Sequence, residues 1–209
     1  MKAQTGGGED RELPPTGLTI GTCIKVIDLG TQERKYNEKT KNERKILVMF
    51  ELPKHRIEID GKDLPMAISK KYTLSFNRKS TLRKDMEQWY GKKFDDKQIE
   101  ASGGFDPSKI LGRPAQIMIT HNVTQTNTYA NIEGLMPLAD GMPAPEQENP
   151  SVLFDLDEFD QNVWDSFSEG MQKWIGKSPE AAAILERGTS KPDSTTNPDD
   201  DFDPDDIPF

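Results

Sequence analysis

Residues 80–91 read STLRKDMEQWYG, and they decide the fold because they place one helix inside a series of strands. Ser80 is a residue type that caps helix N-termini, and Gly91 is one that ends helices. Leu82, Met86 and Trp89 recur at intervals of four and three residues, the spacing of one helix face. This stretch therefore predicts a helix that begins at Ser80 and ends at Gly91.

Three strands are predicted before this helix, over residues 18–29, 45–52 and 66–76. In the first, strict alternation places Ile20, Thr22, Ile24 and Val26 on one face. The second is apolar on both faces over residues 46–50, which indicates deeper burial. In the third, the residues that share a face are Ile68, Tyr72, Leu74 and Phe76.

Two further strands are predicted after the helix, over residues 113–122 and 128–138, with a short helical turn at residues 106–112 ahead of them. Three strands, a helix and two strands is the order of an OB-fold, a small barrel that binds oligonucleotides on its second and third strands. Strand order alone leaves other small barrels open.

Charge is divided unevenly along the chain. Residues 1–140 hold 23 Lys and Arg against 19 Asp and Glu, a net charge of +4, whereas residues 141–209 hold 4 against 17, a net charge of −13. The whole-chain charge of −9 therefore conceals a mildly basic body and a strongly acidic tail.

The tail ends in a specific pattern, Asp205-Asp206-Ile207-Pro208-Phe209. A terminal Phe ring next to its own carboxylate suits a partner with an apolar pocket rimmed by Arg or Lys. A tail that serves only solubility has no need for two apolar residues at its end. This ending resembles the acidic tip of the single-stranded DNA-binding proteins of bacteria and their phages. Residues 105–114, leading into residues 116–121, are similar to the corresponding region of phage proteins of this type.

The resemblance implies an OB-fold that coats single-stranded DNA in phage replication, recombination or repair, and a tip that recruits polymerase, helicase or nuclease partners. The fold class expected is mainly β: a five-stranded OB-fold barrel with a helix between strands three and four, a C-terminal amphipathic helix and a disordered acidic tail. Five parts are expected: a flexible arm (1–16), the DNA-binding OB-fold domain (17–139), a Pro-rich linker (140–150), a helical extension (151–188) and the tail (189–209).

A sequence-tolerant binder of single strands needs cations along a groove and flat rings on which bases stack. The segment of residues 34–45 carries six cations around one Tyr, and residues 70–72 and 77–79 add more. The expected DNA-binding residues are Lys35, Tyr36, Lys39, Lys41, Arg44, Lys70, Lys71, Tyr72, Arg78 and Tyr129. The expected protein-binding residues are Asp205, Asp206, Ile207, Pro208 and Phe209.

Simpler interpretations remain open for several of these residues. Charges in an exposed hairpin are often plain solvation. Tyr72 shares its strand face with Ile68 and Leu74, so core packing and base stacking are both open, and both are open for Tyr129 as well. Apolar residues spaced three or four apart over residues 156–174 predict one amphipathic helix, which packs on the barrel or associates with another molecule.

The sequence contains no motif of a catalytic or phosphate-binding loop and no spacing of His and Cys for a metal, so we expect no enzyme activity, cofactor or metal. One cysteine, Cys23, excludes an internal disulfide, and no secretion signal or membrane span is visible. The expected compartment is the cytoplasm, of the host cell if the protein is phage-encoded. The alternative function is a non-catalytic adaptor whose barrel binds RNA or protein and whose tip docks on a replication enzyme.

Overall fold

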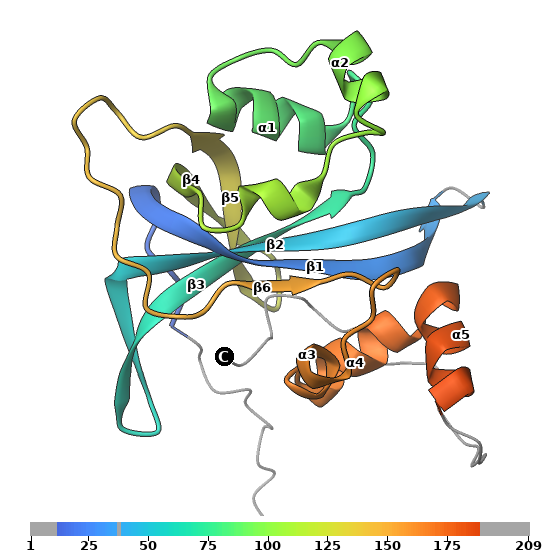
Figure 1. The fold of residues 1–209 in the computed structure, drawn as a ribbon. Coiled ribbons are helices and arrows are strands. Elements are labelled where there is room, and N and C mark those ends of the chain that lie inside the picture. Colours follow the sequence, from blue (N-terminus) through green and yellow to red (C-terminus); the bar gives the residue numbers. More distant parts are fainter. Residues whose placement is uncertain (1–11, 37–38, 189–209) are drawn as a thin grey trace, which may run out of the picture.

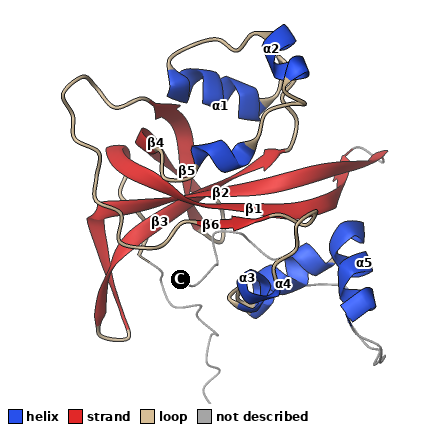
Figure 2. Ribbon diagram, viewed as in Figure 1, coloured by secondary structure: helices blue, strands red, loops and turns tan. Residues whose placement is uncertain are grey.

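This computed structural model describes residues 12–36 and 39–188. Its fold is mainly β. The first eleven residues of the expected N-terminal arm and the whole expected tail, with its tip Asp205–Phe209, lie outside the described residues. One sheet of six strands has helices on both of its sides (Figures 1 and 2). The strands are β1 (Gly17–Tyr36), β2 (Lys39–Ile59), β3 (Lys62–Thr73), β4 (Pro114–Val123), β5 (Thr128–Met136) and β6 (Val152–Phe154).

The sheet follows the path β3-β2-β1-β4-β5, and its neighbours along this path are antiparallel. The short strand β6 pairs parallel to β1 at Lys25–Ile27, beyond the part of β1 that pairs with β4. No ladder joins β3 to β5 in the described chain, although the two strands lie in contact. The sheet is therefore not closed into a barrel, and the structure has an open sheet of six strands where the sequence predicted a five-stranded barrel.

One error in the expected strand pattern has a local cause. The register between β1 and β2 shifts between Cys23 and Lys25, so Ile24 is an extra residue without a partner in β2. Such a bulge turns the following side chains to the other face of the strand. The Ile24 and Val26 side chains therefore pack on opposite sides of the sheet, and the prediction that they share a face was wrong.

The first core lies between the sheet and α1 (Thr81–Tyr90). Phe50, which is fully buried, packs against Trp89 of this helix with ring centroids 5.3 Å apart. The caps predicted from the sequence are confirmed, because the Ser80 side chain accepts from the Arg83 amide and Gly91 has a left-handed φ of 64°. Two short helices, α2 (Asp96–Ala101) and a 3₁₀ turn η1 (Pro107–Ile110), follow before β4.

The second core lies on the other side of the sheet, under the C-terminal helices (Figure 1). The single helix expected over residues 156–174 was wrong. After β6 this region forms two short helices, α3 (Gln161–Asp165) and α4 (Glu169–Gly176), and α5 (Pro179–Gly188) follows. Asp160 and Ser168 each cap a new helix, which divides the apolar stripe. The stripe nevertheless packs against the sheet, as one of the two interpretations predicted.

Polar contacts fix the C-terminal helices to β1. A Cβ added at Gly30, which has a φ of +68°, would lie only 2.3 Å from the Ser178 Oγ, so the start of α5 sits directly on the strand. Beside it the Glu180 carboxylate accepts from the Thr31 amide at 2.9 Å and from the Thr31 hydroxyl at 2.5 Å. The helices and this part of β1 are therefore held together.

The segment of residues 140–150 contains no helix or strand but is tied to the sheet through Glu51. Glu51 is fully buried, and its carboxylate accepts from the Glu148 amide at 2.8 Å and from the Asn149 amide at 2.9 Å. The Asn149 side chain donates to it as well. A buried carboxylate needs such donors, because burying an unpaired charge is very unfavourable.

Replacing Glu51 by Gln exchanges one acceptor oxygen for an NH₂ donor, so at least one of these three N–H groups loses its partner. We expect the free energy of unfolding to fall by about 1–3 kcal/mol, measured by urea unfolding at pH 7. The control is Glu58→Gln, an exposed position on the same strand, with an expected change within about 0.5 kcal/mol. Equal effects of the two substitutions would contradict the role given to Glu51.

Candidate nucleic-acid interface

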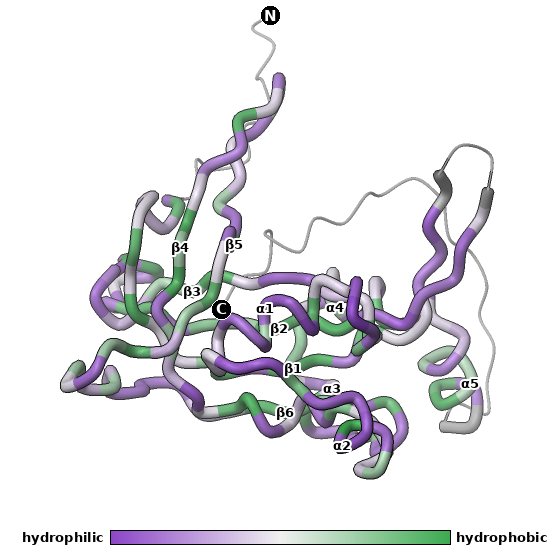
Figure 3. The backbone as a smooth tube through the Cα atoms, turned by 90° about the horizontal axis from the view of Figure 1, so that it is seen from above, coloured by the Kyte–Doolittle hydropathy of each residue, from purple (hydrophilic) through white to green (hydrophobic). Residues whose placement is uncertain are grey.

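The β1–β2 hairpin continues past the core, and its outer part is hydrophilic (Figure 3). Because side chains alternate along a strand, Lys41, Glu43 and Lys45 share one face of β2, while Arg44 points to the other. Lys45 pairs with Thr73 at the end of β3. The hairpin face that carries Lys41 and Lys45 therefore continues across the sheet onto β3.

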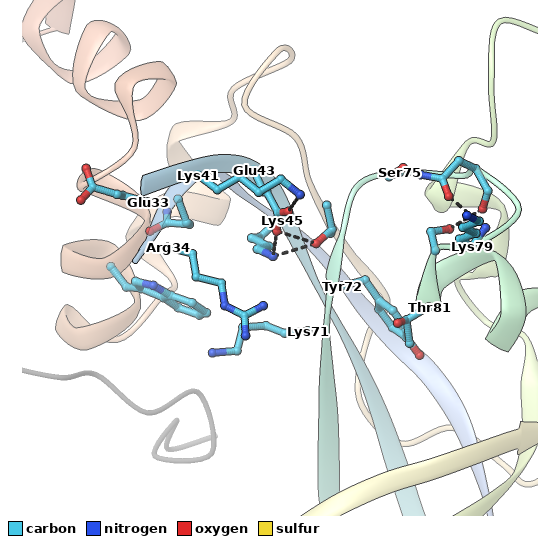
Figure 4. A pocket seen from close by; sticks show the side chains of 15 residues that line it. Glu33, Arg34, Lys41, Glu43, Lys45, Lys71, Tyr72, Ser75, Lys79 and Thr81 are labelled. Carbon is cyan, nitrogen blue, oxygen red and sulfur yellow. Dashed lines mark hydrogen bonds and ion pairs between the residues drawn. The ribbon is translucent and has the colours of Figure 1, made fainter. Parts of the chain in front are cut away.

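An open groove of about 740 Å³ lies along this face. Its walls come from the β1–β2 hairpin, the end of β3, the turn before α1, and α4. Figure 4 shows Arg34 and Lys71 at one end, Lys79 at the other, and Lys41, Glu43 and Lys45 between them. Its charged lining residues are the cations Arg34, Lys41, Lys45, Lys71 and Lys79 and the carboxylates Glu33 and Glu43.

Glu43 partly neutralises the middle of the groove. Its carboxylate pairs with the Lys41 amine and the Lys45 amine at 2.6 Å each, and accepts from the Thr73 hydroxyl at 3.1 Å. These contacts, with Lys41 first, lower the pKa of Glu43 from 4.5 to about 2. Glu43 is thus ionised at neutral pH and pairs with both amines in the middle of the groove.

The ends of the groove carry cations of a different kind. Arg34 and Lys79 are exposed and make no ion pair with any residue in the described ranges. Lys71 places its amine 4.6 Å from the centre of the Trp174 ring of α4, a cation–π contact. The groove thus combines exposed cations with an aromatic ring.

The structure brings three of the expected DNA-binding residues to this groove: Lys41, Lys71 and Tyr72. Tyr72 is only 2% exposed, and its hydroxyl donates to Asp85 at 2.8 Å. Its pKa is raised well above the ordinary value, because burial and the Asp85 carboxylate both disfavour the phenolate. Core packing, the first of the two interpretations of Tyr72, therefore describes its position.

Four expected DNA-binding residues lie elsewhere. Arg44 points to the opposite face of the hairpin and pairs with Asp28 at 2.5 Å, and Lys70 pairs with Asp85 at 2.7 Å. Arg78 pairs with Asp96. Tyr129 is on β5, where its hydroxyl accepts from the Asn127 side chain at 3.1 Å. None of these four lines the groove formed by the described residues.

The remaining three expected residues belong to the end of the hairpin. The backbones of Lys35, Tyr36 and Lys39 form its last pairs, Lys35 with Thr40 and Tyr36 with Lys39. The side chains of these three residues lie outside the part of the chain that the structure describes.

Sequence reasoning did not assign Arg34, Lys45, Lys79 or Trp174 to the binding surface, yet all four line the groove. Strand alternation could have separated Lys45 from Arg44. Trp174 carried no such signal, because it continued an apolar stripe and its position depends on how α4 packs.

The described residues include no group of three or more His, Cys, Asp or Glu side chains arranged to hold a metal ion. None of the helices within the described ranges has the length and apolar character needed to cross a membrane. No family model matches the chain, and no curated protein is significantly similar to it. The arrangement of the groove therefore carries the functional argument.

The low pKa of Glu43 predicts how this residue affects stability as pH changes. A carboxyl whose pKa is lower in the folded than in the unfolded protein stabilises the fold above its unfolded pKa, here 4.5, and loses this effect as pH falls towards about 2. We expect Glu43→Gln to destabilise the protein at pH 6–7 and to have little effect near pH 2, measured by urea unfolding across this range. The control is Glu133→Gln at an exposed position on β5. A pH-independent difference from the parent protein would contradict the prediction.

Proposed function

We propose that this protein binds single-stranded DNA without enzymatic activity, and that the groove between the β1–β2 hairpin, β3, α1 and α4 is its binding site. The observation that carries the proposal is the positive charge of the groove, whose lining contains five cations and two carboxylates although the chain has a net charge of −9. A cationic groove that follows a phosphate backbone is the basic requirement of such binding.

The topology supports the finer proposal of an OB-fold. The strand path β3-β2-β1-β4-β5, with helices inserted between β3 and β4, fits a five-stranded Greek-key barrel that is only partly closed. OB-folds bind oligonucleotides at strands two and three and at the loop between strands one and two. The groove occupies this region, because β2, β3 and the β1–β2 hairpin contribute to its lining.

We further propose that Asp205–Phe209 recruits replication, recombination or repair proteins such as a polymerase, helicase or nuclease. This part of the proposal depends on the resemblance of these five residues to the acidic tip of single-stranded DNA-binding proteins, since they lie outside the described residues. The acidic tail and the basic groove would then have separate tasks, one for protein partners and one for DNA.

The proposal is tested by fluorescence-anisotropy titration of a labelled oligonucleotide of about 30 nucleotides, as single-stranded DNA, duplex DNA and RNA, over a series of salt concentrations. We expect the tightest binding to single-stranded DNA, with affinity falling steeply as salt rises. Preferential RNA binding, or no binding at low salt by either the full chain or a chain lacking residues 199–209, would overturn the proposal and favour the adaptor function.

Charge substitutions locate the binding site. The double variant Arg34→Ala, Lys79→Ala should bind single strands more weakly and reduce the slope of log K against log salt by about 0.7 for each lost phosphate contact. The control is Lys62→Ala, an exposed position at the β2–β3 turn, at the opposite end of β2 from the groove (Figure 1). Equal losses in this control would show that the groove is not the site.

Glu43→Gln should act in the opposite direction. It removes the carboxylate that pairs with Lys41 and Lys45, so both amines become available to phosphate. We expect tighter binding at low salt and a steeper salt dependence than in the parent protein, by the same titration. Unchanged affinity would show that Lys41 and Lys45 do not contact DNA.

A further inference from the structure

Trp174 lines the groove from a helix that the sequence had set apart from the DNA-binding domain. Met171 and Ile175 of α4 are 1% and 0% exposed and belong to the second core. Trp174, between them in sequence, is half-buried: it packs against the same core and also lines the groove. The helix therefore uses one face for packing and presents the Trp174 ring at the edge of that face.

The position of this ring relative to the hairpin is fixed. The turn after α4 meets β1 at Ser178 and Gly30, and Glu180 accepts two hydrogen bonds from Thr31. Arg34, at one end of the groove, follows Thr31 by three residues on the same strand. The contacts that anchor the C-terminal helices thus also set the width of the groove between Trp174 and the hairpin.

The chemistry of the ring suits a nucleobase. Tyr72 and Trp174 are the aromatic residues among the described groove lining, and Tyr72 is 2% exposed with its hydroxyl bonded to Asp85. Trp174 has the larger accessible ring, and the Lys71 amine lies 4.6 Å from its centre. A cation–π contact at an exposed site is weaker than the stacking of a base, so a base can displace the amine, which then remains close to the adjoining phosphate.

We propose that Trp174 is a base-stacking platform and that α4 is a functional wall of the single-strand groove. This inference deepens the proposed function and depends on it. Bases in a duplex are stacked on one another and cannot lie flat on the ring, whereas those of a single strand can. Trp174 therefore contributes to single-strand preference, while the lysines and arginines of the groove attract either form.

The test uses the intrinsic fluorescence of the full chain, which has three tryptophans. Trp89 and Trp164 are 0% and 8% exposed, so stacking on DNA should quench Trp174 alone. We expect saturating unlabelled single-stranded oligonucleotide to quench the tryptophan fluorescence of the parent protein and of the control Trp164→Phe. In Trp174→Leu this quenching should be lost. Duplex DNA should cause little quenching.

Affinity provides the second readout. Trp174→Leu keeps an apolar side chain for packing but removes the flat ring, and we expect about 5- to 150-fold weaker binding of single strands by anisotropy, with duplex affinity unchanged. Trp174→Phe keeps a smaller ring and should be intermediate. If the leucine variant fails to fold, as judged by circular dichroism, the stacking role is still tested by the fluorescence quenching of Trp164→Phe and by the single-strand affinity of Trp174→Phe.

The outcomes separate the two proposals. Tight single-strand binding by anisotropy with no Trp174-dependent quenching, or with full affinity in the Trp174 variants, would overturn the stacking role and leave the proposed function intact. An equal loss of single-strand and duplex affinity would show that Trp174 only supports the fold of the groove, which also overturns the stacking role. Absence of DNA binding by anisotropy would remove the proposed function, and the stacking role with it.

Discussion

The structure depends on the burial of both faces of β1 and β2. Val48 and Phe50 of β2 belong to the first core, while Leu47 and Met49 belong to the second. Neither face can be left in water, because each buried aliphatic side chain contributes about 1.5–3 kcal/mol relative to its exposed form. Helix α1 covers one face and the C-terminal helices cover the other, so the extension after residue 150 is part of the fold.

The groove lies where this two-sided burial ends. Past the pair of Gly30 and Lys45, the described residues of the hairpin belong to neither core. They are polar or charged, which suits a segment that is surrounded by water. The alternation of side chains along β2 places its apolar residues in two different cores, and it likewise places the cations of the hairpin on two different faces. One face forms ion pairs with Asp28 and Asp157 through Arg44, and the other faces the groove. Neighbouring cations on one strand thus have different environments.

Charge is also organised over longer distances. The body has a net charge of +4 and the C-terminal part −13, and within the groove Glu43 offsets part of the positive charge. Exposed charges attract over roughly 8–10 Å at physiological ionic strength, so the affinity of such a groove for an anionic chain is set by the residues that line it and not by the net charge of the whole protein. An acidic protein can therefore carry a cationic binding site.

The sequence by itself determined the elements whose signals are local. Caps at Ser80 and Gly91, the continuous apolar run in β2, and the helical spacing of Leu82, Met86 and Trp89 all depend on neighbouring residues. The mainly β class and the strand–helix order follow from them.

Only the tertiary structure decided the features that depend on contacts between distant segments. The bulge at Ile24, the open sheet, the division of residues 156–174 between α3 and α4, and the partners of Arg44 and Lys70 are of this kind. So is the groove, because Arg34, Lys71, Lys79 and Trp174 come from four separate segments of the chain. The local sequence pattern does not reveal contacts between distant segments, because the free energy that stabilises these contacts is gained only when both faces of the sheet are covered.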